Sequence, residues 1–182
     1  MARPSGTPTD CGARFARRLT RLQSYDYLQQ GAYFITVCTI DRTCLFGDVV
    51  DDAMHPNHSG LAVMDSWDAL PHHYPHVQTI AFALMPNHVH GVVLLNDARQ
   101  EPSLNSSQHS HSLTEAVRAF KSFSARAVNS IRETHGQPVW QRGFYDHVIR
   151  SEGSLHRICE YVANNPLQWK LDRDNPITGG RV

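Results

Sequence analysis

Apolar residues run together or alternate with polar ones in several segments that predict β-strands. Residues 32–40 are β-branched and aromatic almost throughout, which is typical of a strand buried on both faces. Two more apolar segments, 77–85 and 88–95, are separated only by a proline and an asparagine, and this close connection predicts an antiparallel hairpin. We also expect a short strand within residues 42–52 and a final strand over residues 139–149.

Three other segments carry apolar residues at the three- and four-residue spacing of a helix. These segments are 59–71, 112–131 and 151–166. In the second, Ser112 and Glu115 form a capping box, which makes this the clearest helix of the chain. Pro71 is expected to end the first helix and Pro166 the last, because proline cannot continue a helical hydrogen-bond ladder.

The predicted order is strand, helix, two strands, helix, strand and helix. This order indicates an α+β fold in which an antiparallel sheet is covered by helices largely on one face. The ferredoxin-like arrangement is its most economical packing. We expect a flexible basic N-terminal arm over residues 1–30, one domain over 31–170 and a short C-terminal tail over 171–182. The arm is either a solvated tail or a contact for phosphate groups.

Composition limits the classes of function. The 182 residues are 41% hydrophobic and carry a formal net charge of zero, so nucleic-acid binding must come from local basic groups. The four cysteines form no Cys-x-x-Cys pair, which favours thiols in a reducing compartment. Because the apolar runs are too short for a signal peptide or a membrane span, we predict a cytoplasmic protein without membrane association.

The candidate chemistry begins with His88 and His90. Alternate residues of a strand point to the same face, so the two imidazoles are close enough to share a metal ion. The motif alone is weak, because the chain holds twelve histidines. A second pair, His109 and His111, lies in a polar segment without a strand to hold it and is not expected to bind metal.

The last predicted helix carries a tyrosine that its packing pattern does not explain. Tyr161 lies roughly 110° from the centre of the apolar stripe of this helix. A tyrosine that only fills the core should lie on that stripe. Asn165 follows one turn later and is its neighbour on the helix surface, although the proline after it makes helical geometry there less certain. An ordinary exposed tyrosine remains the alternative.

A set of motifs, in order along the chain, carries a more specific resemblance. The motifs are Tyr25-Asp26-Tyr27, 31–36, Leu45-Phe46-Gly47, 85–91, Phe120-Lys121, 140–150 and 161–166. Together they resemble the REP-associated tyrosine transposases, which belong to the single-tyrosine HUH nucleases, from about residue 21 to about residue 170. The resemblance implies a ferredoxin-like HUH domain that cuts and rejoins single-stranded DNA near a hairpin through a covalent 5′-phosphotyrosine.

The resemblance also implies roles for individual residues. Tyr161 would be the catalytic nucleophile, and His88, His90 and Asn165 would be metal ligands. The implied ion is Mg²⁺ or Mn²⁺, although imidazoles accept zinc more tightly. The phenol of a tyrosine, with an ordinary pKa of about 10, needs assistance to lose its proton at neutral pH, and the sequence does not identify the base.

Single-stranded DNA is recognised by basic groups along its backbone and by aromatic side chains that stack on bases. The candidate basic contacts, for which solvated surface is the alternative, are Lys121, Arg142, Arg150 and Arg118. The candidate stacking residues are Trp140, Phe144 and Trp169, and the first two are expected to lie in the core.

Other functions remain open at this point. One is a domesticated protein that binds DNA hairpins without cutting them. Another is a hydrolase in which the histidine pair activates water, but this needs further carboxylate or histidine ligands, and the strand offers none before Asp97. Tyr145 is a weaker candidate for the nucleophile, because sheet packing explains it. Oligomeric state is either monomer or homodimer, and a monomer suffices if Tyr161 reaches the histidine pair of its own chain.

Overall fold

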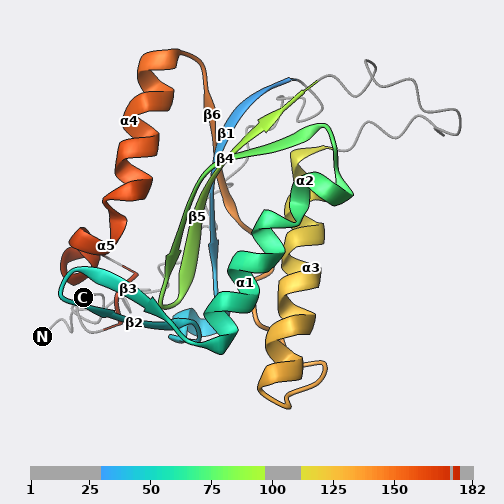
Figure 1. Cartoon of the computed structure of the whole chain (residues 1–182), viewed down its shortest axis with the longest axis vertical. Helices are drawn as coiled ribbons and strands as arrows, with labels where there is room; N and C mark the ends of the chain where they lie inside the picture. Colours follow the sequence, from blue (N-terminus) through green and yellow to red (C-terminus); the bar gives the residue numbers. More distant parts are fainter. Residues whose placement is uncertain (1–29, 97–111, 173, 177–182) are drawn as a thin grey trace, which may run out of the picture.

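The computed structural model describes residues 30–96, 112–172 and 174–176, and a four-stranded antiparallel sheet forms its centre (Figure 1). The strand order is β4–β5–β1–β6, and the strands are β1 (Gly31–Cys38), β4 (Val77–Met85), β5 (His88–Leu95) and β6 (Tyr145–Ile149). The predicted hairpin of β4 and β5 is confirmed, including its bounds. With one helix after β1 and one after β5, this order is the ferredoxin-like arrangement.

Helices cover both faces of the sheet. The helical segments are α1 (His58–Asp68), α2 (Leu70–His73), α3 (Leu113–Ile131), α4 (Glu152–Ala163), α5 (Asn165–Gln168) and the 3₁₀ turns η1 (Ile40–Arg42) and η3 (Trp169–Leu171). Figure 1 shows α1 and α3 on one side of the sheet and α4 on the other. The expectation that helices lie largely on one face is therefore wrong, because α4 has an apolar stripe of its own that the opposite face buries.

The helix ends have identifiable causes. The Ser112 hydroxyl accepts a hydrogen bond from the backbone N–H of Glu115, as the predicted capping box requires, and Ser151 starts α4 in the same way. Helix α4 ends at Ala163, earlier than predicted. Pro166 lies in the first turn of α5, where its missing N–H breaks no helical hydrogen bond, so Asn165 begins a new helix instead of extending the old one.

Two strand predictions need correction. The predicted final strand begins too early, because β6 starts at Tyr145. Before it there is only an isolated bridge between Trp140 and Thr39, flanked by a hydrogen bond from the Gln141 N–H to the Cys38 carbonyl at 2.9 Å. The carbonyls of the three residues after Trp140 accept hydrogen bonds from the Lys121 ammonium instead of joining the ladder. The short strand expected within 42–52 is β2 (Gly47–Val50), which pairs with an unpredicted β3 (Ala53–Pro56).

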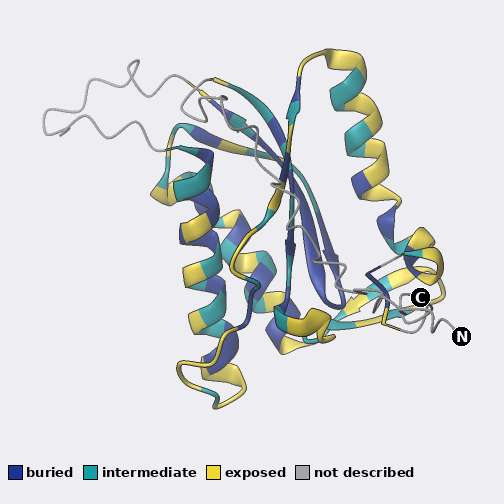
Figure 2. Ribbon diagram, turned by 180° about the vertical axis from the view of Figure 1, so that it is seen from behind, coloured by how far each residue is buried: buried dark blue, intermediate teal, exposed yellow. Residues whose placement is uncertain are grey.

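The main apolar core lies between the sheet and the pair α1 and α3. The Trp67 ring packs against Phe120 and lies so close to Gly91 of β5 that a Cβ atom there would overlap it. A smaller cluster between the sheet and α4 contains Val92 and Val162. Val162 is the only buried side chain on α4, and Figure 2 shows that most of this helix is exposed or half-buried. Helix α4 is therefore held by far fewer buried contacts than α3.

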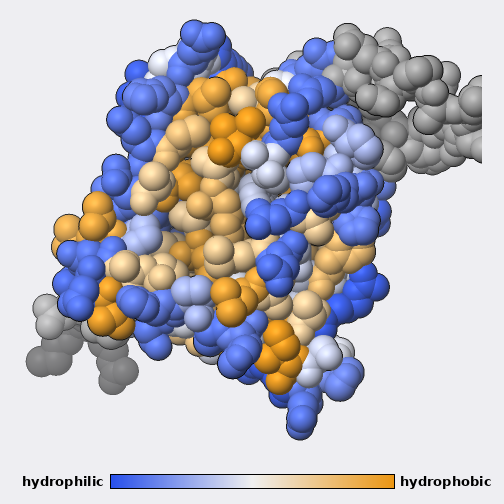
Figure 3. All heavy atoms as spheres, viewed as in Figure 1, coloured by the Kyte–Doolittle hydropathy of each residue, from blue (hydrophilic) through white to orange (hydrophobic). Residues whose placement is uncertain are grey.

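The outer edge of the sheet at β4 is partly apolar. Figure 3 shows apolar side chains gathered between α4 and α1, with hydrophilic side chains around them. Ile80 is 45% exposed there, at a point where the register of β4 and β5 shifts between Thr79 and Ala81. Such a bulge bends an edge strand and disfavours pairing with another chain.

Some predictions fall outside the described residues. These are almost the whole basic arm over 1–30, the motif Tyr25-Asp26-Tyr27 and the pair His109 and His111. Among the described residues, no helix combines the length and the apolar character needed to cross a membrane.

Candidate active site

Sheet register brings the candidate residues to the face that α4 covers. His90 on β5 lies opposite Thr36 on β1, which in turn lies opposite Tyr145 on the edge strand β6. These side chains open onto a cleft of about 750 Å³ that is also lined by Tyr161 and Asn165. The floor of the cleft is therefore the sheet, and residues after α4 close one end of it.

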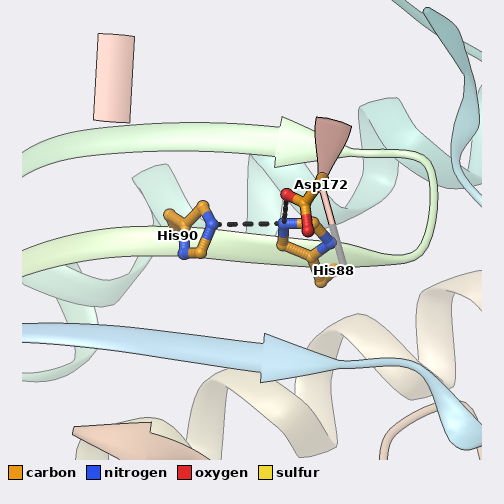
Figure 4. Close-up of side chains that lie close together, drawn as sticks. All are labelled: His88, His90 and Asp172. Carbon is orange, nitrogen blue, oxygen red and sulfur yellow. Dashed lines mark hydrogen bonds and ion pairs between the residues drawn. The ribbon is translucent and has the colours of Figure 1, made fainter. Parts of the chain in front are cut away.

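His88 and His90 point to one another, as their positions in the strand predict. Their Nε2 atoms are 3.2 Å apart, and the two side chains are 0% and 5% exposed (Figure 4). Two nitrogens bound to one ion at about 2.1 Å, with an angle between about 90° and 110°, lie roughly 3.0 to 3.4 Å apart. The observed separation therefore fits one shared divalent cation.

Asn87 sets the orientation of the His88 ring. Its amide nitrogen donates to the backbone carbonyls of Arg42 (2.9 Å) and Asp174 (2.7 Å), so its amide oxygen must face His88 Nδ1, which lies 2.9 Å away. His88 Nδ1 therefore carries the proton and donates it, and the lone pair of Nε2 points toward His90. The sequence analysis treated Asn87 only as a turn residue; its position directly before a buried histidine was the available signal.

Thr36 contacts the outer nitrogen, Nδ1, of the His90 ring. Its hydroxyl lies 2.8 Å from His90 Nδ1 and can either donate or accept a hydrogen bond. His90 can therefore donate from Nε2 to His88, or donate from Nδ1 to Thr36 and leave Nε2 free for an ion, without moving its ring. Sequence analysis missed this role of Thr36, because only sheet register reveals it.

Burial keeps both imidazoles neutral at physiological pH. It lowers the pKa of His88 to about 4, and the positive charge of Arg42 acts in the same direction. Burial lowers the pKa of His90 to about 3, and the nearby His88 also lowers it, while Asp172 opposes the change. A neutral imidazole is the form that binds a metal, so no proton has to be displaced at pH 7.

Asp172 is a site residue that the sequence analysis did not find. Its Oδ2 atom is 3.9 Å from His88 Nε2, and the ligand atoms of Asp172, His88 and His90 all lie within 4.8 Å of one another (Figure 4). Residues 171–182 were interpreted as a tail, and nothing in the spacing of the sequence connects them with β5. A tertiary contact alone brings this carboxylate to the histidine pair.

Tyr161 and Asn165 lie in the same cleft. The Tyr161 ring is 5.4 Å from the His90 ring, between centroids, and 6.0 Å from the Phe34 ring, and the side chain is 41% exposed. Asn165 is 1% exposed, and its Oδ1 atom has no hydrogen-bond partner among the described residues. A buried acceptor without a donor is costly, which is the condition expected of a metal ligand when no ion is bound.

The four candidate DNA contacts divide into two groups. Lys121 and Arg118 lie on α3, on the far side of the sheet from the histidine pair, and Lys121 donates to the carbonyls of residues 141–143 at 2.6 to 3.2 Å. Arg118 forms an exposed pair with Glu115 at 3.6 Å. Arg142 and Arg150 are exposed at the two ends of the β6 region. Arg142 is the nearer to the cleft, since Gln141 and Gly143 line it.

The aromatic residues predicted to stack on DNA bases also differ in how far they are exposed. Trp140 is buried in the main core, as expected, and the half-buried Phe144 lines the cleft. Trp169 is only 9% exposed, with its ring centroid 6.1 Å from that of His88. It is therefore a packing residue of the site rather than an open platform for a base. Tyr145, 46% exposed in the cleft, is the more accessible aromatic side chain.

Comparisons with known proteins bear on the family resemblance and the fold. No family model matches the chain. It is 35% identical over 170 residues to an uncharacterised protein of Haemophilus influenzae, covering 86% of this chain and 92% of the relative. It is 24% identical over 148 residues to a second protein of that organism, provisionally named a REP-associated tyrosine transposase, covering 79% and 74%.

A solved structure shares the fold. It is a REP-associated tyrosine transposase bound to a REP hairpin, with a TM-score of 0.54 and 17% identity, covering 81% of this chain and 73% of that one. The resemblance to the REP-associated tyrosine transposases is therefore found both in the sequence of a distant relative and in the fold of a solved structure. The family resemblance and the fold class predicted from the motifs are thereby confirmed.

The donor set fits the metal that the family resemblance implies. Two neutral imidazole nitrogens face one another at a suitable separation. The Asp172 carboxylate lies near them, and the buried Asn165 oxygen belongs to a residue that lines the same cleft, so both offer oxygen donors. A mixture of nitrogen and oxygen ligands suits Mn²⁺ and Zn²⁺ better than Mg²⁺, which prefers oxygen alone.

Proposed function

We propose that the chain is a metal-dependent endonuclease and strand transferase that cuts single-stranded DNA beside a hairpin and joins it to Tyr161. The observation that carries this proposal is the approach of the Tyr161 ring to His90, inside a cleft that is also lined by Asn165, whose oxygen has no hydrogen-bond partner among the described residues. A phenol beside a cation site is the arrangement that phosphoryl transfer to tyrosine needs.

The proposed reaction exchanges one ester for another. The Tyr161 hydroxyl oxygen attacks phosphorus and forms an O–P bond as the bond from phosphorus to the 3′-oxygen breaks. The phenol loses its proton, and the departing 3′-oxygen gains one. Attack by a 3′-hydroxyl on the phosphotyrosine reverses these changes and joins the strands. Because each step trades one phosphodiester for another, joining needs no nucleotide cofactor.

His88, His90 and Asn165 would hold the divalent cation, Mg²⁺ or Mn²⁺. When bound, such an ion neutralises negative charge on the phosphate oxygens. Asn87 keeps the His88 lone pair pointed into the site, and the Thr36 hydroxyl can accept a hydrogen bond from His90 Nδ1. The Asn87 contact therefore holds His88 in the tautomer that a cation requires, and the Thr36 contact allows the same tautomer at His90.

The proposed partner is a single-stranded DNA with a hairpin. Its support is the relative that is bound to a REP hairpin. The total charge of the chain is zero, so contacts must be local, and Arg142 and Arg150 are the exposed basic candidates on the β6 side. Lys121 would act on DNA indirectly, by holding the loop that carries Arg142.

One chain supplies the whole proposed site. Tyr161 approaches His90 of its own chain, so a monomer could assemble the nucleophile and the ligands without exchanging helices. A homodimer is not required for cleavage under this proposal.

One observation favours the alternative function, a hydrolase that activates water. It needs a carboxylate beside the histidine pair, and Asp172 offers one. Both functions then predict metal-dependent cleavage, but only the transposase function predicts a covalent protein–DNA product. A binder without catalysis would have no use for an exposed tyrosine and, in the same cleft, a buried amide oxygen that no described residue contacts by a hydrogen bond.

The test is incubation with end-labelled hairpin oligonucleotides from the neighbourhood of the gene, with Mn²⁺ or Mg²⁺, followed by denaturing electrophoresis. We expect a protein–DNA product that disappears in Tyr161→Phe and with chelator. Tyr145→Phe is the matched control, since Tyr145 lines the same cleft and is 46% exposed, against 41% for Tyr161. Cleavage without a covalent product supports the hydrolase, and loss of the product in Tyr145→Phe alone moves the nucleophile to β6.

A further inference from the structure

Residues 169–172 and 174–176, which we call the C-terminal segment, lie beside the turn between β4 and β5 and bring an acidic side chain to the histidine pair. Asp172 Oδ2 lies 3.9 Å from His88 Nε2, and Figure 4 shows the carboxylate beside the His88 ring. All three ligand atoms of this group lie within 4.8 Å of one another. This separation is too long for a good hydrogen bond and somewhat longer than the roughly 3.0 to 3.4 Å between two ligands of one ion, so a short movement of the Asp172 carboxylate toward the histidine pair would complete the ligand set.

The chemistry of the facing atoms suits a cation. The only proton of a neutral His88 is committed to Asn87, so its Nε2 presents a lone pair to the site, 3.2 Å from His90 Nε2 and 3.9 Å from Asp172 Oδ2. A cation bound here would be attracted by the His88 lone pair and by the Asp172 carboxylate at once. His90 can present a third lone pair here, because the Thr36 hydroxyl can accept its Nδ1 proton.

The segment is anchored independently of the Asp172 Oδ2 atom. Asn87 donates to the Asp174 carbonyl at 2.7 Å, Arg42 forms an ion pair with the Asp174 carboxylate, and Asn175 donates to the Trp169 carbonyl at 2.9 Å. The Asp174 N–H donates to Asp172 Oδ1 at 2.7 Å, which orients the carboxylate and leaves Oδ2 toward His88. The carboxylate is therefore positioned before any ion arrives.

We infer that Asp172 is a further ligand of the cation held by His88 and His90, so that the packing of the C-terminal segment and metal binding strengthen one another. The inference deepens the proposed function and rests on it for the identity of the site. A carboxylate supplies the negative charge that two imidazoles and one amide lack. Because the same residue belongs to the C-terminal segment, any gain in metal affinity from Asp172 is also a gain in the stability of that segment.

The test is Mn²⁺ binding without DNA, measured by calorimetry on the full chain. Asp172→Asn retains an oxygen that can accept from the Asp174 N–H but removes the charge, and we expect at least fivefold weaker Mn²⁺ binding. Asp52→Asn is the matched control: Asp52 contacts Lys170 at 3.3 Å on the surface, and its loss should leave affinity unchanged. A change below fivefold in Asp172→Asn overturns the inference, and so does an equal loss in Asp52→Asn.

Two further measurements separate ligation from a folding defect. Asp172→Glu keeps a carboxylate and should recover part of the affinity that Asp172→Asn loses, whereas a merely structural role predicts no recovery. Hydrogen exchange should show that Mn²⁺ slows exchange at the Asp174 amide in the native chain, and not in Asp172→Asn. Equal slowing in both proteins contradicts the coupling of metal binding with the segment.

The outcomes distinguish this inference from the proposed function. Normal Mn²⁺ binding by Asp172→Asn, together with a covalent DNA product on Tyr161, overturns the ligand role and leaves the function standing. Weakened Mn²⁺ binding by Asp172→Asn without any covalent product from the native chain supports the ligand role and contradicts the transposase function.

Discussion

The Tyr161 ring lies 5.4 Å from the His90 ring, although one belongs to α4 and the other to the opposite layer, strand β5. The exposed tyrosine thus meets a buried histidine whose lone pair can face an ion. Since α4 is held to the sheet mainly through a small cluster around Val162, this meeting depends on a lightly packed helix.

Acid should destabilise the fold through His88 and His90. In the folded protein the pKa of His88 is about 4 and that of His90 about 3, below the ordinary value of 6.5. Between each folded pKa and 6.5, the unfolded chain therefore binds a proton that the folded chain does not. Stability is therefore fully present above about pH 6.5 and falls as pH decreases, by up to about 1.4 kcal/mol per pH unit for each histidine.

Urea unfolding in chelator at pH 7.5, 6.5 and 5.5 measures this slope. His90→Gln should flatten it, whereas His147→Gln, at an exposed position on β6, should not. Equal slopes for the native chain and His90→Gln would show that the buried pair is not the source of acid sensitivity.

Asn87 should matter for stability and for metal binding together. Asn87→Ala removes the acceptor of His88 Nδ1 and leaves the carbonyls of Arg42 and Asp174 without their donor, so we expect a loss of about 2 to 4 kcal/mol. The control is Asn57→Ala, which removes the cap of α1 and should cost about 1 kcal/mol without changing Mn²⁺ affinity. Unchanged Mn²⁺ affinity in Asn87→Ala would contradict the role assigned to the His88 tautomer.

Asn165 should stabilise the protein only when a metal is bound. Its buried Oδ1 atom has no partner among the described residues, so Asn165→Leu, a change of similar shape, should alter the free energy of unfolding in chelator by less than about 1 kcal/mol. The rise in melting temperature that Mn²⁺ produces should be smaller in the variant. A full Mn²⁺ response in Asn165→Leu would remove Asn165 from the ligand set.

Replacing Lys121 should lower the stability of the protein more than replacing Arg118, although both residues lie on α3. Lys121→Met leaves three carbonyls of the loop 141–143 without their donor and should cost about 1 to 3 kcal/mol. Arg118→Ala breaks only an exposed pair with Glu115 and should cost less than about 0.5 kcal/mol. Urea unfolding compares the two, and similar losses would contradict the structural role of Lys121.

Much of the fold follows from local patterns in the sequence. The bounds of β4 and β5 were predicted because the runs are apolar and a Pro-Asn turn separates them. The start of β6 was not, because Lys121 diverts the carbonyls of residues 141–143 from the ladder, and that contact joins distant parts of the chain. Helices on both faces were also unexpected, since a stripe on α4 does not say which face of the sheet it covers.

The candidate site was predictable only in part. The strand spacing predicted the shared face of His88 and His90, and the offset of Tyr161 from the apolar stripe predicted an exposed ring. Asn165 was predicted as a metal ligand only through the family resemblance. The structure adds that its oxygen is buried without a hydrogen-bond partner among the described residues. Asp172 and Thr36 could not be predicted, because a folded-back segment and the sheet register bring them to the pair.

The central claim is that Tyr161 forms the covalent bond to DNA. Its most direct test is mass spectrometry of protease-digested protein after reaction with a hairpin oligonucleotide and Mn²⁺. The account predicts a peptide that contains Tyr161 and carries the mass of a 5′-phosphorylated nucleotide fragment, absent when chelator is added. Modification of Tyr145 or another residue, or cleaved DNA with every tyrosine peptide unmodified, would contradict it.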